Sequence, residues 1–154
     1  MDKIEKAKKI ISEILYITLA TSSKGGGPWN TPVYSSYDEN YNFFWVSSPE
    51  SRHSKNIKEN NRIAIVIYNS TDPEGTGRGV YIQATAHEVI DEKEIEKALG
   101  LLYGRKNKAP KPITDFLGDS PRRVYQAVPQ KFWMNETQKV NGHPVDVRTE
   151  VDIK

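Results

Sequence analysis

The sequence of 154 residues predicts a mainly β fold, a six-stranded antiparallel barrel with peripheral helices. Runs rich in β-branched and aromatic residues recur along the first 133 positions, which is typical of strands. Most of these runs are separated by short segments of Gly, Pro, Asp and Asn, as in antiparallel sheets. A parallel sheet needs a helix after each strand, and the only long helical pattern between strands comes late in the chain.

Each element follows from the spacing of its apolar residues. Isoleucine and alanine recur at helical spacing over residues 4–14, so an amphipathic helix is expected there. The predicted strands are 16–21, 29–37, 43–47, 62–69, 80–91 and 123–133. Helical spacing returns over 91–102 with Asp91 as the N-cap, and short helices are expected at 51–60 and 114–117.

Two prolines interrupt the predicted strands, and the last twenty residues show no strand or helix pattern. Pro32 lies inside the second strand and indicates a sheet edge or a bulge, and Pro129 interrupts the last strand. Residues 135–154 are polar and show no period. We therefore expect one barrel domain over residues 1–134 and a polar C-terminal tail over 135–154 that is disordered or wraps a partner.

Composition excludes several classes of protein. Lys and Arg total 22 and Asp and Glu total 20, so the net charge is +2 and no charged block favours nucleic acid. The chain has no cysteine, which excludes disulfides, zinc–thiolate sites, iron–sulfur clusters and a thiol nucleophile. Its three histidines are scattered, so no metal site is expected. No apolar run reaches membrane-spanning length and the charged N-terminus is unlike a signal peptide, so we expect a cytoplasmic protein without membrane contact.

A candidate ligand site follows the third strand. That strand ends at Ser47 and Ser48, and a short helix begins with Ser51, Arg52 and His53. A helix N-terminus presents unpaired N–H groups and the positive end of the dipole, and an arginine can grip two phosphate oxygens. The pattern favours a phosphate site. A solvated connecting helix with an ordinary serine start has the same composition.

Several segments, taken in order, point to one family. Residues 51–57 read Ser-Arg-His-Ser-Lys-Asn-Ile, residues 31–34 read Thr-Pro-Val-Tyr, and 16–21 and 80–86 are matching strands. In these features the chain resembles the pyridoxamine 5′-phosphate oxidase-like, FMN-binding split-barrel family, from about residue 4 to residue 133. The resemblance implies a homodimer of split barrels with two FMN sites at the interface.

The resemblance also implies which residues bind FMN. The phosphate-binding positions fall on Ser51, Arg52 and His53, with Ser47 and Ser48 just before them. The family usually has lysine where His53 stands, so binding is expected to depend on pH.

Other positions of the family flank the isoalloxazine ring, where main-chain groups of an irregular strand bind its polar edge. They fall on Asn30, Thr31, Pro32, Val33, Trp45 and Val46. Trp133 resembles an aromatic residue that contacts the flavin from the partner subunit, and it fits equally well as a core or interface tryptophan.

One family feature is missing. A true pyridoxamine 5′-phosphate oxidase carries Arg-x-His-Asp-Arg shortly after that tryptophan, and residues 134–144 contain no such element. Vitamin B6 oxidation is therefore not expected, although the cofactor is.

We expect an FMN-binding oxidoreductase that passes electrons between a small-molecule donor and an acceptor, with no catalytic side chain assigned. Alternatives are a split barrel that binds deazaflavin F420, or haem through His53 or His143, and a non-enzymatic flavin-storage, sensing or interaction module.

Overall fold

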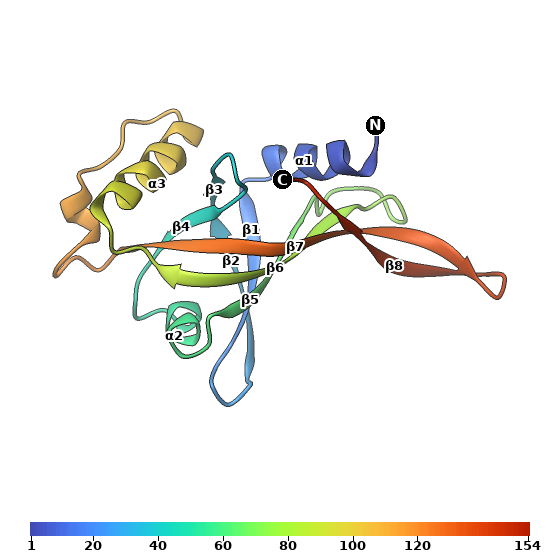
Figure 1. The fold of residues 1–154 in the computed structure, drawn as a ribbon, viewed down its shortest axis with the longest axis horizontal. Coiled ribbons are helices and arrows are strands. Elements are labelled where there is room, and N and C mark those ends of the chain that lie inside the picture. The colour runs from blue at the N-terminus through green and yellow to red at the C-terminus, as the bar shows by residue number, and fades with distance from the viewer.

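The computed structural model describes residues 1–154 and confirms a mainly β fold with peripheral helices (Figure 1). A single antiparallel sheet runs in the order β2-β1-β5-β6-β7-β4-β3, and β8 pairs with β7. The strands are β1 Tyr16–Ser22, β2 Pro28–Tyr34, β3 Ser36–Tyr37, β4 Phe43–Ser47, β5 Arg62–Tyr68, β6 Gly79–Glu88, β7 Arg123–Val140 and β8 His143–Val151. The helices are α1 Lys3–Glu13, α2 Arg52–Glu59, α3 Glu92–Arg105 and the short 3-10 helix η1 Ile113–Phe116. No helix is long and apolar enough to cross a membrane.

The curled sheet has apolar side chains on both faces along β4. Phe43 and Trp45 belong to the cluster that fills the barrel, whereas Phe44 belongs to a second cluster beneath α3. This confirms that β4 is buried on both faces. The same alternation places the last residues of β4 between the barrel and α3.

Arg105, in the last turn of α3, fastens this helix to the N-terminal part of the chain. Its guanidinium donates to the carbonyls of Ser35, Ser12 and Ile14 at 3.0, 2.9 and 3.1 Å, and also to Ile11. The last carbonyls of α1 have no partner within their own helix, so one arginine satisfies several of them. The end of α3 is thereby held beside the junctions α1–β1 and β2–β3.

The sheet has eight strands rather than six. The strand expected over residues 29–37 is divided into β2 and β3, because Ser35 leaves the ladder and donates its N–H to the carbonyl of Leu15 at 3.0 Å. Pro32 lies on β2 and pairs with Thr18 of β1, and β2 is at one end of the strand order. The edge position predicted from this proline is confirmed.

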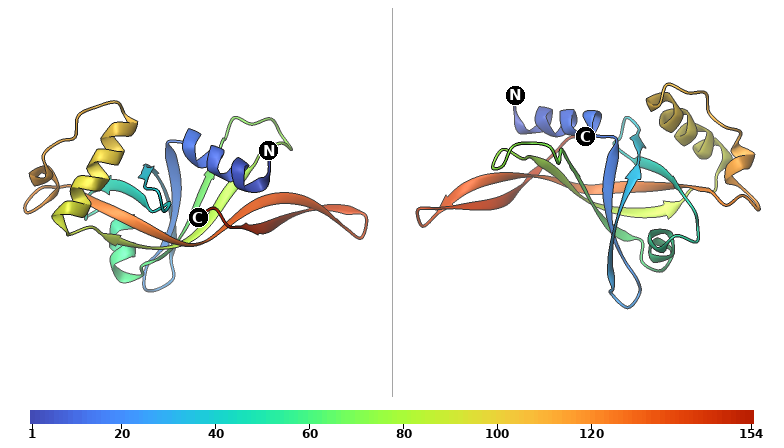
Figure 2. Two further views of the ribbon diagram at one scale, coloured as in Figure 1. Left: turned by 45° about the horizontal axis from the view of Figure 1, so that its top comes forward. Right: turned by 180° about the vertical axis from the view of Figure 1, so that it is seen from behind.

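Of the two expectations for the polar tail over residues 135–154, disorder is wrong. β7 continues to Val140, turns at Asn141 and Gly142, and returns as β8, which projects from the barrel (Figures 1 and 2). Both turn residues have positive φ, 51° and 80°, which suits the tight turn of a β-hairpin. Ile153 beyond β8 is buried in the barrel core, so the end of the chain is anchored.

Asp38 is the one acidic side chain in the interior. It accepts hydrogen bonds from the N–H groups of Asn40 and Asn42, from the Asn42 amide, and from Lys97 of α3 at 3.0 Å. Burial alone would raise the pKa of this carboxyl, but the hydrogen bonds outweigh it and the pKa is lowered. The ionised carboxylate therefore stabilises the β3–β4 turn and its contact with α3.

Asp38→Asn is expected to lower the free energy of unfolding by about 2 kcal/mol at pH 7, because hydrogen bonds to a charged group are lost. The wild-type contribution is complete above the unfolded pKa of about 3.9 and disappears as the pH falls through the lower, folded value. Urea denaturation at pH 7 and in the acid range measures both effects. Glu39→Gln, at an exposed neighbour, is the control, and an equal loss in both variants would contradict this role.

Candidate functional site

The turn between β4 and α2 leaves the helix N-terminus open. The carbonyl of Ser48 accepts both the N–H and the hydroxyl of Ser51, at 3.1 and 2.8 Å. Ser51 is the N-cap, yet its hydroxyl makes no capping hydrogen bond. The N–H groups of Arg52, His53 and Ser54 therefore have no acceptor in the protein. Three free donors at the positive end of a helix dipole form a binding site for an anion.

His53 is held at the base of this turn. Its Nε2 lies 2.7 Å from Oγ of Ser47 and 3.3 Å from Oγ of Ser51, and the residue is buried. Burial lowers the pKa of the imidazole. At neutral pH the ring is uncharged and positions the two serines, and an anion nearby would favour its protonated form.

Arg52 supplies a free positive charge at the same helix start. Its guanidinium carbon lies 4.2 Å from the centre of the Trp29 ring, a cation–π contact with β2. Arg52 takes part in no ion pair with a carboxylate. The side chain is oriented by Trp29 and remains available to an anionic ligand.

A cavity of about 360 Å³ opens beside this turn, between β2, the end of β4, the start of α2, the end of α3 and η1. Half of the residues predicted from the sequence line it, namely Thr31, Pro32, Val33, Val46, Ser47 and His53. The others in its wall are Tyr16, Tyr34, Leu102, Tyr103, Lys106, Phe116 and Arg122. The lining thus includes four tyrosine or phenylalanine rings and two cations, and no carboxylate is present.

The remaining predicted residues lie outside this cavity. Ser48, Ser51 and Arg52 belong to the turn beside it, and Asn30 is exposed on β2. Trp45 is fully buried inside the barrel, where its ring stacks on Tyr125 at 5.9 Å and its Nε1 has no partner. Its side chain is therefore not available to a ligand in the cavity.

Trp133 is far from this cavity within one chain. It lies on β7 ten residues beyond Arg123, which pairs with Ser47. Ten residues of strand span about 33 Å. Trp133 is not among the residues that line the cavity of its own chain.

Local sequence patterns contain little sign of the cavity residues at and after the end of α3. Tyr103, Lys106 and Arg122 follow the α2 turn by fifty residues or more and carry no motif. The only available signal was the basic, proline-containing segment at 105–112 after α3. Their proximity to His53 results from the packing of α3 on β4, through contacts that local spacing does not encode.

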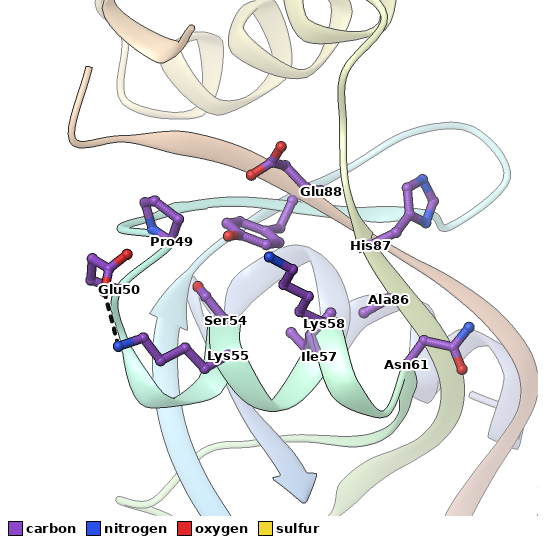
Figure 3. Close-up of a pocket in the computed structure, with 11 residues that line it drawn as sticks. Pro49, Glu50, Ser54, Lys55, Ile57, Lys58, Asn61, Ala86, His87 and Glu88 are labelled. Atoms are coloured by element: carbon purple, nitrogen blue, oxygen red, sulfur yellow. Dashed lines mark ion pairs between the residues drawn. The ribbon is translucent and has the colours of Figure 1, made fainter. Parts of the chain in front are cut away.

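A larger hollow of about 500 Å³ lies against another side of α2 (Figure 3). Its walls come from α2, from the preceding turn and from β6, and Lys55 is already paired with Glu50 at 2.9 Å. None of the residues predicted to bind a cofactor lines it. No group of three or more His, Asp or Glu residues is placed to hold a metal ion anywhere in the chain.

The comparisons with known proteins establish the family. The family model described as pyridoxamine 5′-phosphate oxidase matches residues 4–133, so this chain belongs to that family, whose members commonly bind flavins. This confirms the resemblance found in the sequence. A comparison with curated proteins gave no match.

Solved structures of the same fold have diverse descriptions. A heme binding protein from Mycobacterium smegmatis has a TM-score of 0.72 and 18% identity over 97% of this chain and 58% of its own, so this chain spans less than two thirds of that protein. A heme storage protein from Vibrio cholerae has a TM-score of 0.61 and 16% identity, covering 86% and 94%. An F420 reductase has a TM-score of 0.60 and 17% identity, covering 82% and 94%. At such low identities the likeness establishes the fold alone.

The buried His53 is expected to titrate below the ordinary histidine value of about 6.5. Because its pKa is lowered in the fold, the neutral ring contributes stability above pH 6.5, and this contribution is lost as the pH falls through the folded value. NMR titration of the imidazole signals measures the pKa, with His53→Gln as the assignment variant. A midpoint above 6.5 in the ligand-free protein would contradict the placement of this ring.

Proposed function

We propose that this chain is an FMN-binding flavoprotein that acts as an oxidoreductase between a small-molecule donor and an acceptor. The single observation that carries the proposal is the open start of α2, where three N–H groups and Arg52 lack an anionic partner beside an aromatic cavity. FMN combines a phosphate dianion with a flat ring. The phosphate suits the start of α2, and the ring suits the aromatic cavity beside it. Membership of a family whose members commonly bind flavins supports it.

The phosphate is assigned to Ser51, Arg52 and His53, with Ser47 and Ser48 at the adjoining strand end. The free N–H groups would donate to phosphate oxygens, and Arg52 would add charge-assisted hydrogen bonds. The hydrogen bonds of His53 to the serines orient their hydroxyls. Protonation of His53 would strengthen the attraction, so FMN affinity is expected to rise as the pH falls toward the lowered pKa of this ring.

The isoalloxazine ring is assigned to the face made by Asn30, Thr31, Pro32, Val33 and Val46. β2 is an edge strand, so its main-chain groups are not all used by the sheet. When bound, FMN supplies the redox chemistry, and the chain binds it, orients it and sets its surroundings. The side chain of Trp45 is buried, so this residue can contribute only through its backbone.

A homodimer completes the proposal. Trp133 lies about 33 Å along β7 from the cavity of its own chain, and in a twofold assembly it would approach the cavity of the partner. Trp29 and Tyr16 leave large apolar surfaces exposed on β2 and β1, which a second copy would bury.

The site offers less support for the two alternative cofactors, haem and F420. A haem would need an axial histidine, and Nε2 of His53 already bonds Ser47, while His143 lies exposed at the tip of the hairpin. F420 also carries a phosphate and a flat ring, so the spectrum of the bound ligand must decide between it and FMN. Residues 134–144 lie along the hairpin and contain no Arg-x-His-Asp-Arg element, so vitamin B6 oxidation is not proposed.

The purified protein is expected to carry, or to take up, a yellow ligand with the absorbance of FMN, identified by mass spectrometry after release. A haem band or a deazaflavin spectrum would replace the assigned cofactor. Bound flavin that no nicotinamide donor reduces would favour a storage or sensing role. A protein that stays colourless with added FMN would refute the cofactor assignment.

Arg52→Ala is expected to weaken FMN binding by ~2–3 kcal/mol, or roughly 30- to 150-fold, because charge-assisted hydrogen bonds to the phosphate are lost. Fluorescence titration of FMN measures the dissociation constant. Arg62→Ala removes an equal charge at the start of β5, away from the cavity, and should have little effect. An unchanged constant for Arg52→Ala would show that the phosphate binds elsewhere.

A further inference from the structure

The outer half of the β7–β8 hairpin has no third strand beside it. β8 pairs with β7 and with no other strand. Figures 1 and 2 show the hairpin projecting from the barrel, with no helix or strand next to its tip. A two-stranded hairpin alone is marginally stable in water, and three or more strands with an apolar face are needed for independent stability. The outer edge of β8 is therefore open to another strand.

The turn of the hairpin determines which backbone groups of β8 face outward. The two-residue turn at Asn141 and Gly142 makes Val140 and His143 a hydrogen-bonded pair. Along an antiparallel ladder, hydrogen-bonded and non-hydrogen-bonded pairs alternate. The residues that direct their backbone groups away from β7 are therefore Pro144, Asp146, Arg148 and Glu150.

The charges on this edge are complementary to a second copy of the same strand. Asp146 and Arg148 lie on either side of Val147 and form an ion pair at 2.5 Å. In an antiparallel pair of β8 strands centred on Val147, Asp146 of each copy lies directly opposite Arg148 of the other. The four charges then alternate in sign, so each carboxylate has two guanidinium neighbours. Opposite charges in cross-strand pairs stabilise a sheet.

The same register satisfies the free backbone groups. Asp146 and Arg148 both face outward, so across the twofold axis each exchanges two hydrogen bonds with the other residue. Pro144 has no N–H to donate, and in this register it lies opposite Glu150 at the two ends of the pairing. The proline therefore limits the length of the pairing and leaves its centre intact.

The other face of the hairpin adds apolar contact. Val145 and Val147 alternate with the charged residues, so they share the face of Thr149, which continues from the barrel interior at Met134. Val145 is exposed in a single chain. In the twofold register Val147 meets its own copy, and Val145 lies opposite Thr149. Two separate hairpins thus become one four-stranded ribbon with a row of valines.

We propose that the outer edge of β8 is a docking surface for a second copy of this chain, by twofold antiparallel pairing centred on Val147. The contact lies outside residues 4–133, which the family model matches. It uses a strand edge, whereas the homodimer of the proposed function uses the barrel surface that contains Trp133. It is therefore a separate interface and does not require FMN. The charges that match a copy of β8 also discourage pairing with unrelated strands.

The chain has no cysteine, so a single introduced cysteine reports this contact. Val147→Cys is expected to form a disulfide between two copies under mild oxidation. Opposite residues of a non-hydrogen-bonded antiparallel pair have Cα atoms about 4.5 Å apart, which is within disulfide reach. Val145→Cys is the matched control, because this exposed position on the same face is displaced from its own copy by four residues, or about 13 Å along the strand.

Non-reducing electrophoresis at micromolar protein separates the outcomes. A covalent dimer of Val147→Cys, with Val145→Cys remaining a single chain, is the expected result. Equal cross-linking of the two variants would show random collision, and no cross-linking of Val147→Cys would show that the strands do not pair. Either result would overturn the proposal.

Exchange of the two charges tests the complementarity. Asp146→Arg and Arg148→Asp should each weaken association through β8 about tenfold or more, because each variant places two like-charge pairs across the axis. The double variant exchanges the charges and should restore the wild-type dissociation constant. Sedimentation equilibrium measures the association. A double variant as weak as the single ones would contradict the register.

The barrel homodimer and the β8 contact fail in different ways. If both form, Asp146→Arg should leave a dimer that binds FMN with a dissociation constant within about twofold of the wild type. If only the β8 contact forms, the same variant should be a monomer. A wild-type chain that is monomeric at about 100 μM would refute both contacts, whereas a dimer whose mass Asp146→Arg does not change would refute the β8 contact alone.

Discussion

The structure depends on β7, whose two edges pair with three different strands, β6, β4 and β8. A strand offers two rows of backbone hydrogen bonds. One edge of β7 pairs with β6 from Tyr125 to Met134, while the other pairs with β4 over its first five residues and with β8 from Phe132 onward. Pro129 lies in the interval between β4 and β8, and its carbonyl accepts Nζ of Lys154 at 3.1 Å. A residue without an N–H is tolerated where one edge has no strand partner.

This arrangement also positions the site. Because β4 is held on β7, its final residue Ser47 lies where α2 begins, and His53 can bond back to it. The packing of α3 on the outer face of β4 brings Lys106 to the other side of the same cavity. Arg105 fixes the end of α3, because its guanidinium donates hydrogen bonds to four backbone carbonyls of the N-terminal segment. Two helices far apart in sequence thus form one binding cavity around a single strand end.

Local patterns were sufficient for most of the elements. The helical period over residues 4–14 and the Asp91 N-cap predicted α1 and α3 because caps and amphipathic spacing act within one or two turns. The β7–β8 hairpin was missed although Asn141-Gly142 is a strong turn signal, since its outer half is polar and has no apolar face. Backbone pairing, rather than burial, orders that outer half.

The sequence by itself determined the family, most of the strand and helix pattern, and the serine-rich start of α2 with its exposed N–H groups, because each depends on neighbouring residues. Only the tertiary structure decided which distant side chains meet there. It buried Trp45 inside the barrel, separated Trp133 from the cavity of its own chain, and brought Lys106 and Arg122 into that cavity. These outcomes follow from the register of β7 and the packing of α3 on β4. Both are set by long-range contacts, which produce no periodic pattern in the sequence.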